Sequence, residues 1–142
     1  MSQPDPFPIV QGAYQVTADW TIALPASFKM RIEDGSLVLW RSGVTAWIIV
    51  WKKPPEETKS DRLARLRQGI SRAAFDLEAE TDEGLLRLSY RLRDEGTDAT
   101  AAAFYSFVVG EEGHVQMAVY FDAEADIATA QTLWRGLEET DH

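Results

Sequence analysis

The side chains that most often carry catalysis or bind metal ions are scarce in this sequence. It contains no cysteine and only two histidines, His114 and His142. Disulfides and thiolate chemistry are therefore excluded, and no pair of histidines has the spacing of a zinc site. His114 comes at the start of a predicted strand, so we expect it at the surface or rim of the protein rather than in a catalytic role.

One acidic segment resembles the beginning of a calcium-binding loop. Asp122, Glu124 and Asp126 alternate along the chain as the first ligands of an EF-hand loop do. The sixth loop position, however, carries Ile127 instead of glycine, and the twelfth carries Leu133 instead of glutamate. We interpret the segment instead as the acidic start of a helix, where carboxylates interact favourably with the helix dipole.

The sequence also lacks the motifs of nucleophilic and nucleotide-dependent enzymes. It contains no Gly-x-Ser-x-Gly, no Gly-x-x-x-x-Gly-Lys and no Gly-x-Gly-x-x-Gly. Adjacent carboxylates occur in predicted loops and turns, where such pairs are usually solvated. We therefore predict a protein that is not an enzyme, with no catalytic residues, no metal site and no cofactor.

Positive charge is concentrated in one short segment. Residues 52–72 hold seven basic and three acidic side chains, whereas the whole chain has a net charge of −9. That overall charge disfavours binding to nucleic acid or to an anionic membrane surface. The basic segment is either a solvated helix face that pairs with the acidic remainder of the protein or a docking site for an acidic protein surface. Its members are Lys52, Lys53, Lys59, Arg62, Arg65, Arg67 and Arg72.

A strand that is apolar at almost every position precedes the basic segment. Successive side chains of a strand point to opposite faces, so Thr45, Trp47, Ile49 and Trp51 share the face opposite Val44, Ala46, Ile48 and Val50. If the second set lies in the main core, the first must be covered by a helix or by a partner. Both interpretations stay open: the face that carries Trp47 is either part of the core or a groove for a partner. The candidate protein-binding residues are Trp47, Ile49, Trp51, Lys52, Lys53, Arg62 and Arg65.

Hydrophobic periodicity predicts an α+β fold, a mostly antiparallel β-sheet of about six to eight strands with two main helices. The helices are expected over residues 60–71 and 122–137. The strands are expected at 20–24, 28–33, 37–40, 44–51, 75–80, 85–93, 102–109 and 114–121. The strand 85–93 has the clearest alternation, which predicts a solvent-facing row of Arg87, Ser89, Arg91 and Arg93. A single domain over residues 12–142 would follow an extended leader, residues 1–11.

The location of the protein is predicted by elimination. The first ten residues lack the basic start and apolar run of a signal peptide. The longest apolar run, residues 46–51, is far shorter than the ~20 residues of a membrane helix. We therefore expect a cytoplasmic protein.

Three stretches resemble the Mog1/PsbP-like fold group, which includes small bacterial proteins. They are the opening strand Trp20–Pro25, the strand pair 102–109 and 114–121 around a Gly-Glu-Glu-Gly turn, and the segment Tyr120–Asp122 that leads into an amphipathic C-terminal helix. The resemblance covers most of the chain in order. It implies binding rather than catalysis, because the group is mostly known for adaptors and for chaperones, among them those that load type VI secretion effectors.

Together these features predict a non-enzymatic protein-binding module, a bacterial adaptor or chaperone whose partner is another protein or a second copy in a homodimer. A homodimer would also hide the Trp-bearing face, because an isologous interface covers the same patch on both copies. The alternative is a small-molecule or lipid-binding domain with a pocket between sheet and helix.

Overall fold

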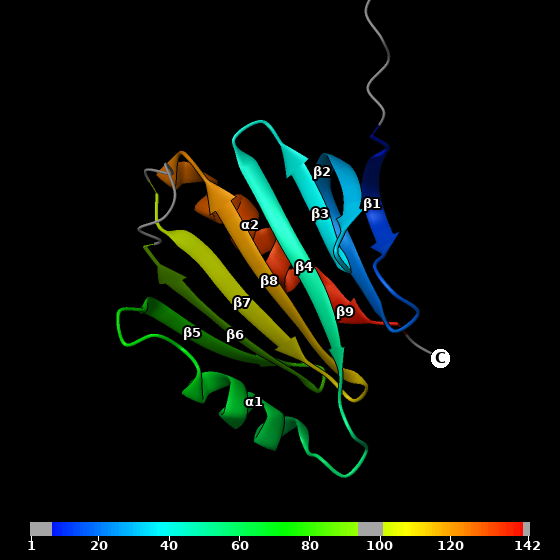
Figure 1. The fold of residues 1–142 in the computed structure, drawn as a ribbon, viewed down its shortest axis with the longest axis vertical. Helices are drawn as coiled ribbons and strands as arrows, with labels where there is room; N and C mark the ends of the chain where they lie inside the picture. The colour runs from blue at the N-terminus through cyan, green and yellow to red at the C-terminus, as the bar shows by residue number, and fades with distance from the viewer. Residues whose placement is uncertain (1–6, 94–100, 141–142) are drawn as a thin grey trace, which may run out of the picture.

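A computed structural model describes residues 7–93 and 101–140. Within these residues the chain forms one sheet of nine strands, two α-helices and a short 3-10 helix (Figure 1). The strands are β1 (Ile9–Gln15), β2 (Trp20–Glu33), β3 (Ser36–Arg41), β4 (Val44–Lys52), β5 (Phe75–Asp82), β6 (Leu85–Leu92), β7 (Ala103–Val109), β8 (Gly113–Phe121) and β9 (Leu137–Glu139). The helices are α1 (Lys59–Gln68), η1 (Glu124–Asp126) and α2 (Ile127–Arg135).

The sheet is antiparallel throughout its described pairs, in the order β1-β2-β3-β4-β8-β7-β6-β5, with β9 paired to β2. The pairing of β4 with β8 joins the two halves of the chain, and its register runs from Val44 opposite Phe121 to Lys52 opposite Gly113. Helix α1 lies in the connection from β4, a central strand, to β5 at the far edge. The predicted α+β fold with an antiparallel sheet is confirmed.

The strands differ from the predicted set at Pro25 and at the two ends of the described chain. Pro25 does not end a strand; it lies inside β2, where the register against β1 shifts between Leu24 and Phe28. A proline is tolerated there because a bulge leaves its position outside the regular hydrogen-bond ladder. Strand β1 begins at Ile9, inside the expected leader, and α2 ends at Arg135, so that residues 137–139 form β9 instead of a last helical turn.

One face of the sheet packs against α2, which lies behind the strands in Figure 1. Ala130, Leu133 and Trp134 of α2 are completely buried in the hydrophobic core. The Trp134 ring meets Phe104 edge-on at 5.9 Å, and its indole N–H donates to the Phe107 carbonyl at 3.3 Å. This face holds the main core, which also includes Trp20, Ile22, Phe28, Ala46, Ile48, Met117, Val119 and Phe121.

The arginine row predicted to face solvent on β6 lies beneath α2 instead. Arg87 is 1% exposed, and Ser89 and Arg91 are also buried, so that prediction is wrong for these three residues. Arg93 is exposed, as predicted. Arg87 donates to the carbonyls of Trp134 and Leu137, at 2.7 and 2.8 Å, and Arg91 donates to Ala102 and binds Glu124. Backbone carbonyl oxygens at the end of α2 accept hydrogen bonds from Arg87. Strand alternation alone predicts that this cation is solvated, because it does not show where a helix supplies such partners.

The other face of the sheet carries α1 at one end only, the lower end in Figure 1. The side-chain oxygen of Thr58 accepts a hydrogen bond from the Asp61 N–H at 3.0 Å and so begins the helix. Leu63 and Leu66 are half-buried, and the fully buried residue of α1 is Arg62. Helix α1 is therefore attached to the sheet much less tightly than α2.

Candidate binding face

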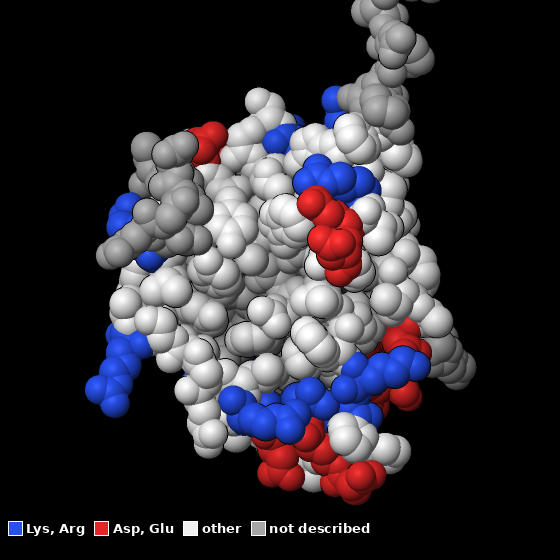
Figure 2. Space-filling view, in the orientation of Figure 1, with Lys and Arg blue, Asp and Glu red and all other residues white. Residues whose placement is uncertain are grey.

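The side of the sheet away from α2 gathers aromatic side chains from four neighbouring strands. We call it the open face. Figure 2 shows it as a hollowed surface of uncharged residues with Lys and Arg gathered along its lower edge. Strand register places its members side by side: Trp47, Ile49 and Trp51 of β4, Gln116, Ala118 and Tyr120 of β8, Tyr105 and Phe107 of β7, and Tyr90 of β6.

The three predicted residues of β4 stand together on this face. Trp47 and Ile49 are half-buried, and Trp51 is 49% exposed. The C-terminal helix could have covered them, but α2 and its Trp134 pack on the opposite face of the sheet. Of the two interpretations left open, cover by the C-terminal helix is excluded, because α2 is on the far side of the β4 backbone.

A row of tyrosines adds to the open face. The rings of Tyr90 and Tyr105 stack at 5.4 Å, and Tyr105 meets Tyr120 edge-on at 6.2 Å with the two hydroxyl oxygens 3.4 Å apart. All three side chains are half-buried, and burial raises the pKa of Tyr90. Such a row offers apolar ring area and hydroxyl groups to one ligand. Sequence reasoning missed it, because the three tyrosines lie on separate strands and only the register brings them together.

An arginine holds the tryptophans at the β2–β3 side of the open face. The Arg31 guanidinium lies over the rings of Trp40 and Trp47, with its carbon 5.0 and 5.7 Å from their centroids. Arg31 also pairs with Glu33 at 2.8 Å. Cation–π contacts of this kind fix ring orientation, so Trp47 is presented in a set position.

The predicted basic residues surround the opposite end, and part of their charge is neutralised within the chain. Arg62 and Arg65 both pair with Glu57, the latter at 3.1 Å, and the Lys53 ammonium donates to the Glu57 carbonyl at 2.8 Å. Arg62 is buried, which sequence reasoning did not anticipate. The Arg65 side chain is 60% exposed, whereas Lys52, also exposed, follows Trp51 in β4 and so points to the opposite face of the sheet.

His114 is buried rather than at the rim, so that expectation is wrong. Only 3% of its surface is exposed, and Arg62 and Arg65 of α1 lie close enough to act on its charge. Its ring stacks against Trp51 at 6.5 Å and meets Phe107 edge-on at 6.0 Å. Neither ring nitrogen has a hydrogen-bond partner among the described residues. Burial, with Arg62 and Arg65 nearby, lowers the pKa of His114 to about 4.

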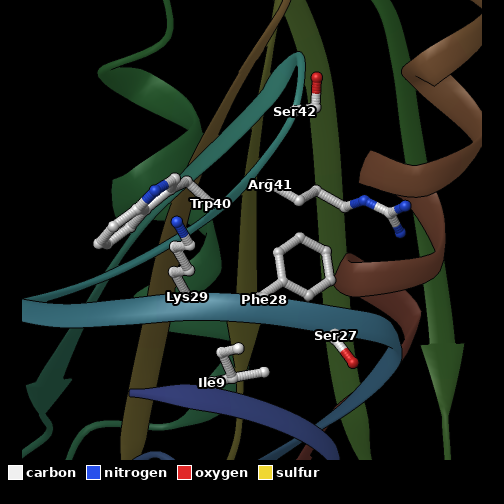
Figure 3. Close-up of a pocket in the computed structure, with 7 residues that line it drawn as sticks. All are labelled: Ile9, Ser27, Phe28, Lys29, Trp40, Arg41 and Ser42. Carbon is white, nitrogen blue, oxygen red and sulfur yellow. The ribbon is translucent and has the colours of Figure 1, made fainter. Parts of the chain in front are cut away.

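Several cavities lie away from the open face. One of about 280 Å³ opens where β1 begins, and Figure 3 shows Phe28 at its centre with Lys29 and Arg41 on either side. Its other lining residues are Ile9, Ser27, Trp40 and Ser42. The second, of about 360 Å³, lies between β5–β7 and α2 and contains the Arg91–Glu124 ion pair. The second matches the predicted location between sheet and helix, and so does a third, of about 360 Å³, which lies between β2 and the end of α2.

Two further observations concern metal ions and membranes. In residues 7–93 and 101–140, no group of three or more histidine, aspartate or glutamate side chains could hold a metal ion. The helices of these segments are too short or too polar to cross a membrane.

Comparison of the chain with protein-family models and with curated proteins gives no match.

Proposed function

We propose that this protein is a non-enzymatic binding module whose open face receives a segment of another protein. The observation that carries the proposal is the position of Trp47, Ile49 and Trp51, which project from the face that α2 leaves uncovered. Large aromatic side chains and arginine are the residues most enriched at the energetic centres of protein interfaces. Burying their remaining exposed area would stabilise a complex by about 25 cal/mol per Å².

The chemistry of the open face defines its occupant. Its centre is apolar and aromatic, so the bound segment is apolar where it meets Trp47 and the tyrosine row. Its lower end carries the arginines of α1, of which Arg65 is 60% exposed. We therefore assign the occupant as an apolar segment of a partner protein that ends in acidic residues, which the cations attract and orient.

The cellular role we propose is that of a bacterial adaptor or chaperone in the cytoplasm, of the kind that loads type VI secretion effectors. The fold-level resemblance supports this role, and so does the open shape of the face, since an adaptor must hold a segment of its client without chemically changing it. A homodimer through the same face is the competing assembly.

The test compares Trp47→Glu with a control at an exposed apolar position of another strand, Leu77→Glu on β5. Solution mass by light scattering and binding to proteins that co-purify with the wild type are measured for all three. We expect that a purified partner binds the wild type and the Leu77 variant directly and does not bind Trp47→Glu. The bound segment of that partner should be apolar, should end in acidic residues and should contact the open face. Equal binding by both variants would remove the open face from consideration, and loss of dimer mass alone would assign the face to self-association.

A second candidate function is supported by the cavity around Phe28. Its apolar base and its two cations, Lys29 and Arg41, would suit a small apolar anion such as a fatty acid. Titration with decanoate, followed by amide NMR shifts at Phe28 and Trp40, tests this candidate. Binding that Arg41→Gln abolishes would support a lipid-binding role, whereas shifts confined to the open face, or none, would contradict it.

A further inference from the structure

The buried imidazole of His114 is an anomaly that requires an explanation. Both of its ring nitrogens are buried and without a hydrogen-bond partner among the described residues. Buried polar groups in folded proteins are almost always paired, because an unpaired one has lost its bonds to water and gained none. His114 therefore makes the end of the open face beneath α1 less stable than its apolar packing alone would suggest.

Helix α1, whose Arg62 and Arg65 lie near His114, is held by several polar contacts. Arg62 of α1 is buried and donates to the Lys52 carbonyl at 3.0 Å. The Lys59 ammonium donates to the Gly84 carbonyl at 2.7 Å and pairs with Glu111 at 2.8 Å. The apolar residues Leu63 and Leu66 are only half-buried. A helix attached in this way can separate from the sheet without opening the core that α2 covers.

The charged surroundings of His114 favour its neutral form. Arg62 and Arg65 of α1 are the cations that act on it, and Glu57, in the loop before α1, is the anion. Strands β4 and β7 present the uncharged rings of Trp51 and Phe107. A proton added to His114 would place a third cation beside the two arginines, in a position that water does not reach.

We propose that α1 is a pH-dependent cover on the lower end of the open face, closed while His114 is neutral and released when His114 is protonated. Release exposes His114, Phe107 and the inner side of Trp51 and so lengthens the surface available to a partner. The inference rests on the proposed function of the open face and names how access to that face is regulated.

The size of the effect follows from the two protonation equilibria. His114 has a pKa of about 4 under the closed helix and the ordinary value of 6.5 once solvated. Linkage then makes the equilibrium constant for opening α1 about 20-fold larger near pH 5 than near pH 7. Below the closed-state pKa the constant stops changing, because both states then bind the proton.

The experiment measures hydrogen exchange of the α1 amides in the free protein, corrected for the intrinsic rate at each pH, with β7 and β8 amides as the internal reference. We expect the opening constant of α1 to rise about 20-fold from pH 7 to pH 5 while the reference amides keep theirs. His114→Phe, which keeps a ring between Trp51 and Phe107, should abolish the rise. The imidazole itself is followed by NMR in a His142→Gln background, in which His114 gives the single histidine signal.

A surface pair of variants tests the same cover without disturbing packing. Arg65→Gln removes a cation that repels protonated His114 in the closed state, so it should make the rise in the opening constant at low pH smaller. Arg67→Gln, at an exposed arginine of the same helix, should leave the rise unchanged. The proposal is overturned if α1 and the reference strands open together, or if His114 is protonated while α1 stays closed. Because no partner is present in these measurements, that outcome would leave the Trp47→Glu test of the proposed function standing.

Discussion

Arg87 donates to the carbonyl oxygen of Trp134 at 2.7 Å, from a side chain that is almost fully buried. The contact joins β6 to the last turn of α2, and the second nitrogen of the same guanidinium reaches the Leu137 carbonyl at the start of β9. The last carbonyls of a helix have no partner within the helix, and a cation there also interacts favourably with the helix dipole. This side chain therefore adds a polar anchor to the apolar packing that holds α2 on the sheet. Desolvation lowers the pKa of Arg87, which is the cost of placing it there.

Replacing this arginine should destabilise the protein strongly. Arg87→Met keeps most of the side-chain length but leaves two buried carbonyls unpaired, so we expect the free energy of unfolding to fall by about 3 kcal/mol. Urea denaturation measures the change. Arg93→Met, at an exposed position just beyond the same strand, is the control and should change stability by no more than about 0.5 kcal/mol. Equal stabilities for the two variants would show that Arg87 contributes little to holding α2.

Neighbouring residues of β4 should respond in opposite ways to the same substitution. Ile48 is 1% exposed in the core, whereas Trp47 points to the open face and is half-buried. A carboxylate at position 48 would be desolvated without a partner, so Ile48→Glu should unfold the protein or lower its stability by more than about 4 kcal/mol. Trp47→Glu should stay folded and lose about 1–2 kcal/mol of packing. Circular dichroism and thermal unfolding measure whether each variant folds and how stable it is. A Trp47→Glu protein that fails to fold would mean that Trp47 is a core residue.

The sequence is most informative where structure depends on local alternation and least informative where it depends on register. Strands β3 and β4 follow from apolar runs and β6 and β8 from period-two patterns, with turns between them, and neighbouring residues determine both signals. The tyrosine row depends on how β6, β7 and β8 align, and no single strand contains that information. Arg87 and His114 were misplaced for a related reason: which face of a strand is covered depends on where α2 and α1 pack, and alternation shows only that two faces exist.

Protonation of His114 should make the protein acid-sensitive. Its folded-state pKa is about 4, below the value of 6.5 expected when it is solvated. The unfolded chain therefore binds the proton more readily, and the free energy of unfolding falls as the pH is lowered from about 6.5 to about 4, by up to about 3 kcal/mol. Carboxylates titrate in the lower part of this range, so the informative quantity is the difference between wild type and His114→Phe. As the pH falls, the wild type should lose more stability than His114→Phe. Stability curves that run parallel over this pH range would contradict the burial of an unpaired His114.

Gly113 permits the close approach of β8 to β4 beside His114. It has φ +155°, and a Cβ there would lie 1.9 Å from the Trp51 carbonyl oxygen and 2.9 Å from the Lys52 Cα, both backbone atoms. Gly113→Ala must therefore separate the strands where Lys52 and Gly113 pair, at the base of the Trp51–His114 stack.

We expect Gly113→Ala to lower the free energy of unfolding by more than about 2 kcal/mol, through backbone strain and lost strand pairing. Gly69→Ala is the control, because Gly69 has an ordinary right-handed conformation and the nearest atom to its added Cβ would be 3.5 Å away. Where the Gly113 variant remains folded, separation of the strands admits water to His114, and the pKa of His114 should rise from about 4 toward 6.5. Denaturation and an NMR titration of the histidine signal measure the two effects; a stable variant with an unchanged histidine titration would show that β4 and β8 do not meet as closely at this point as the structure places them.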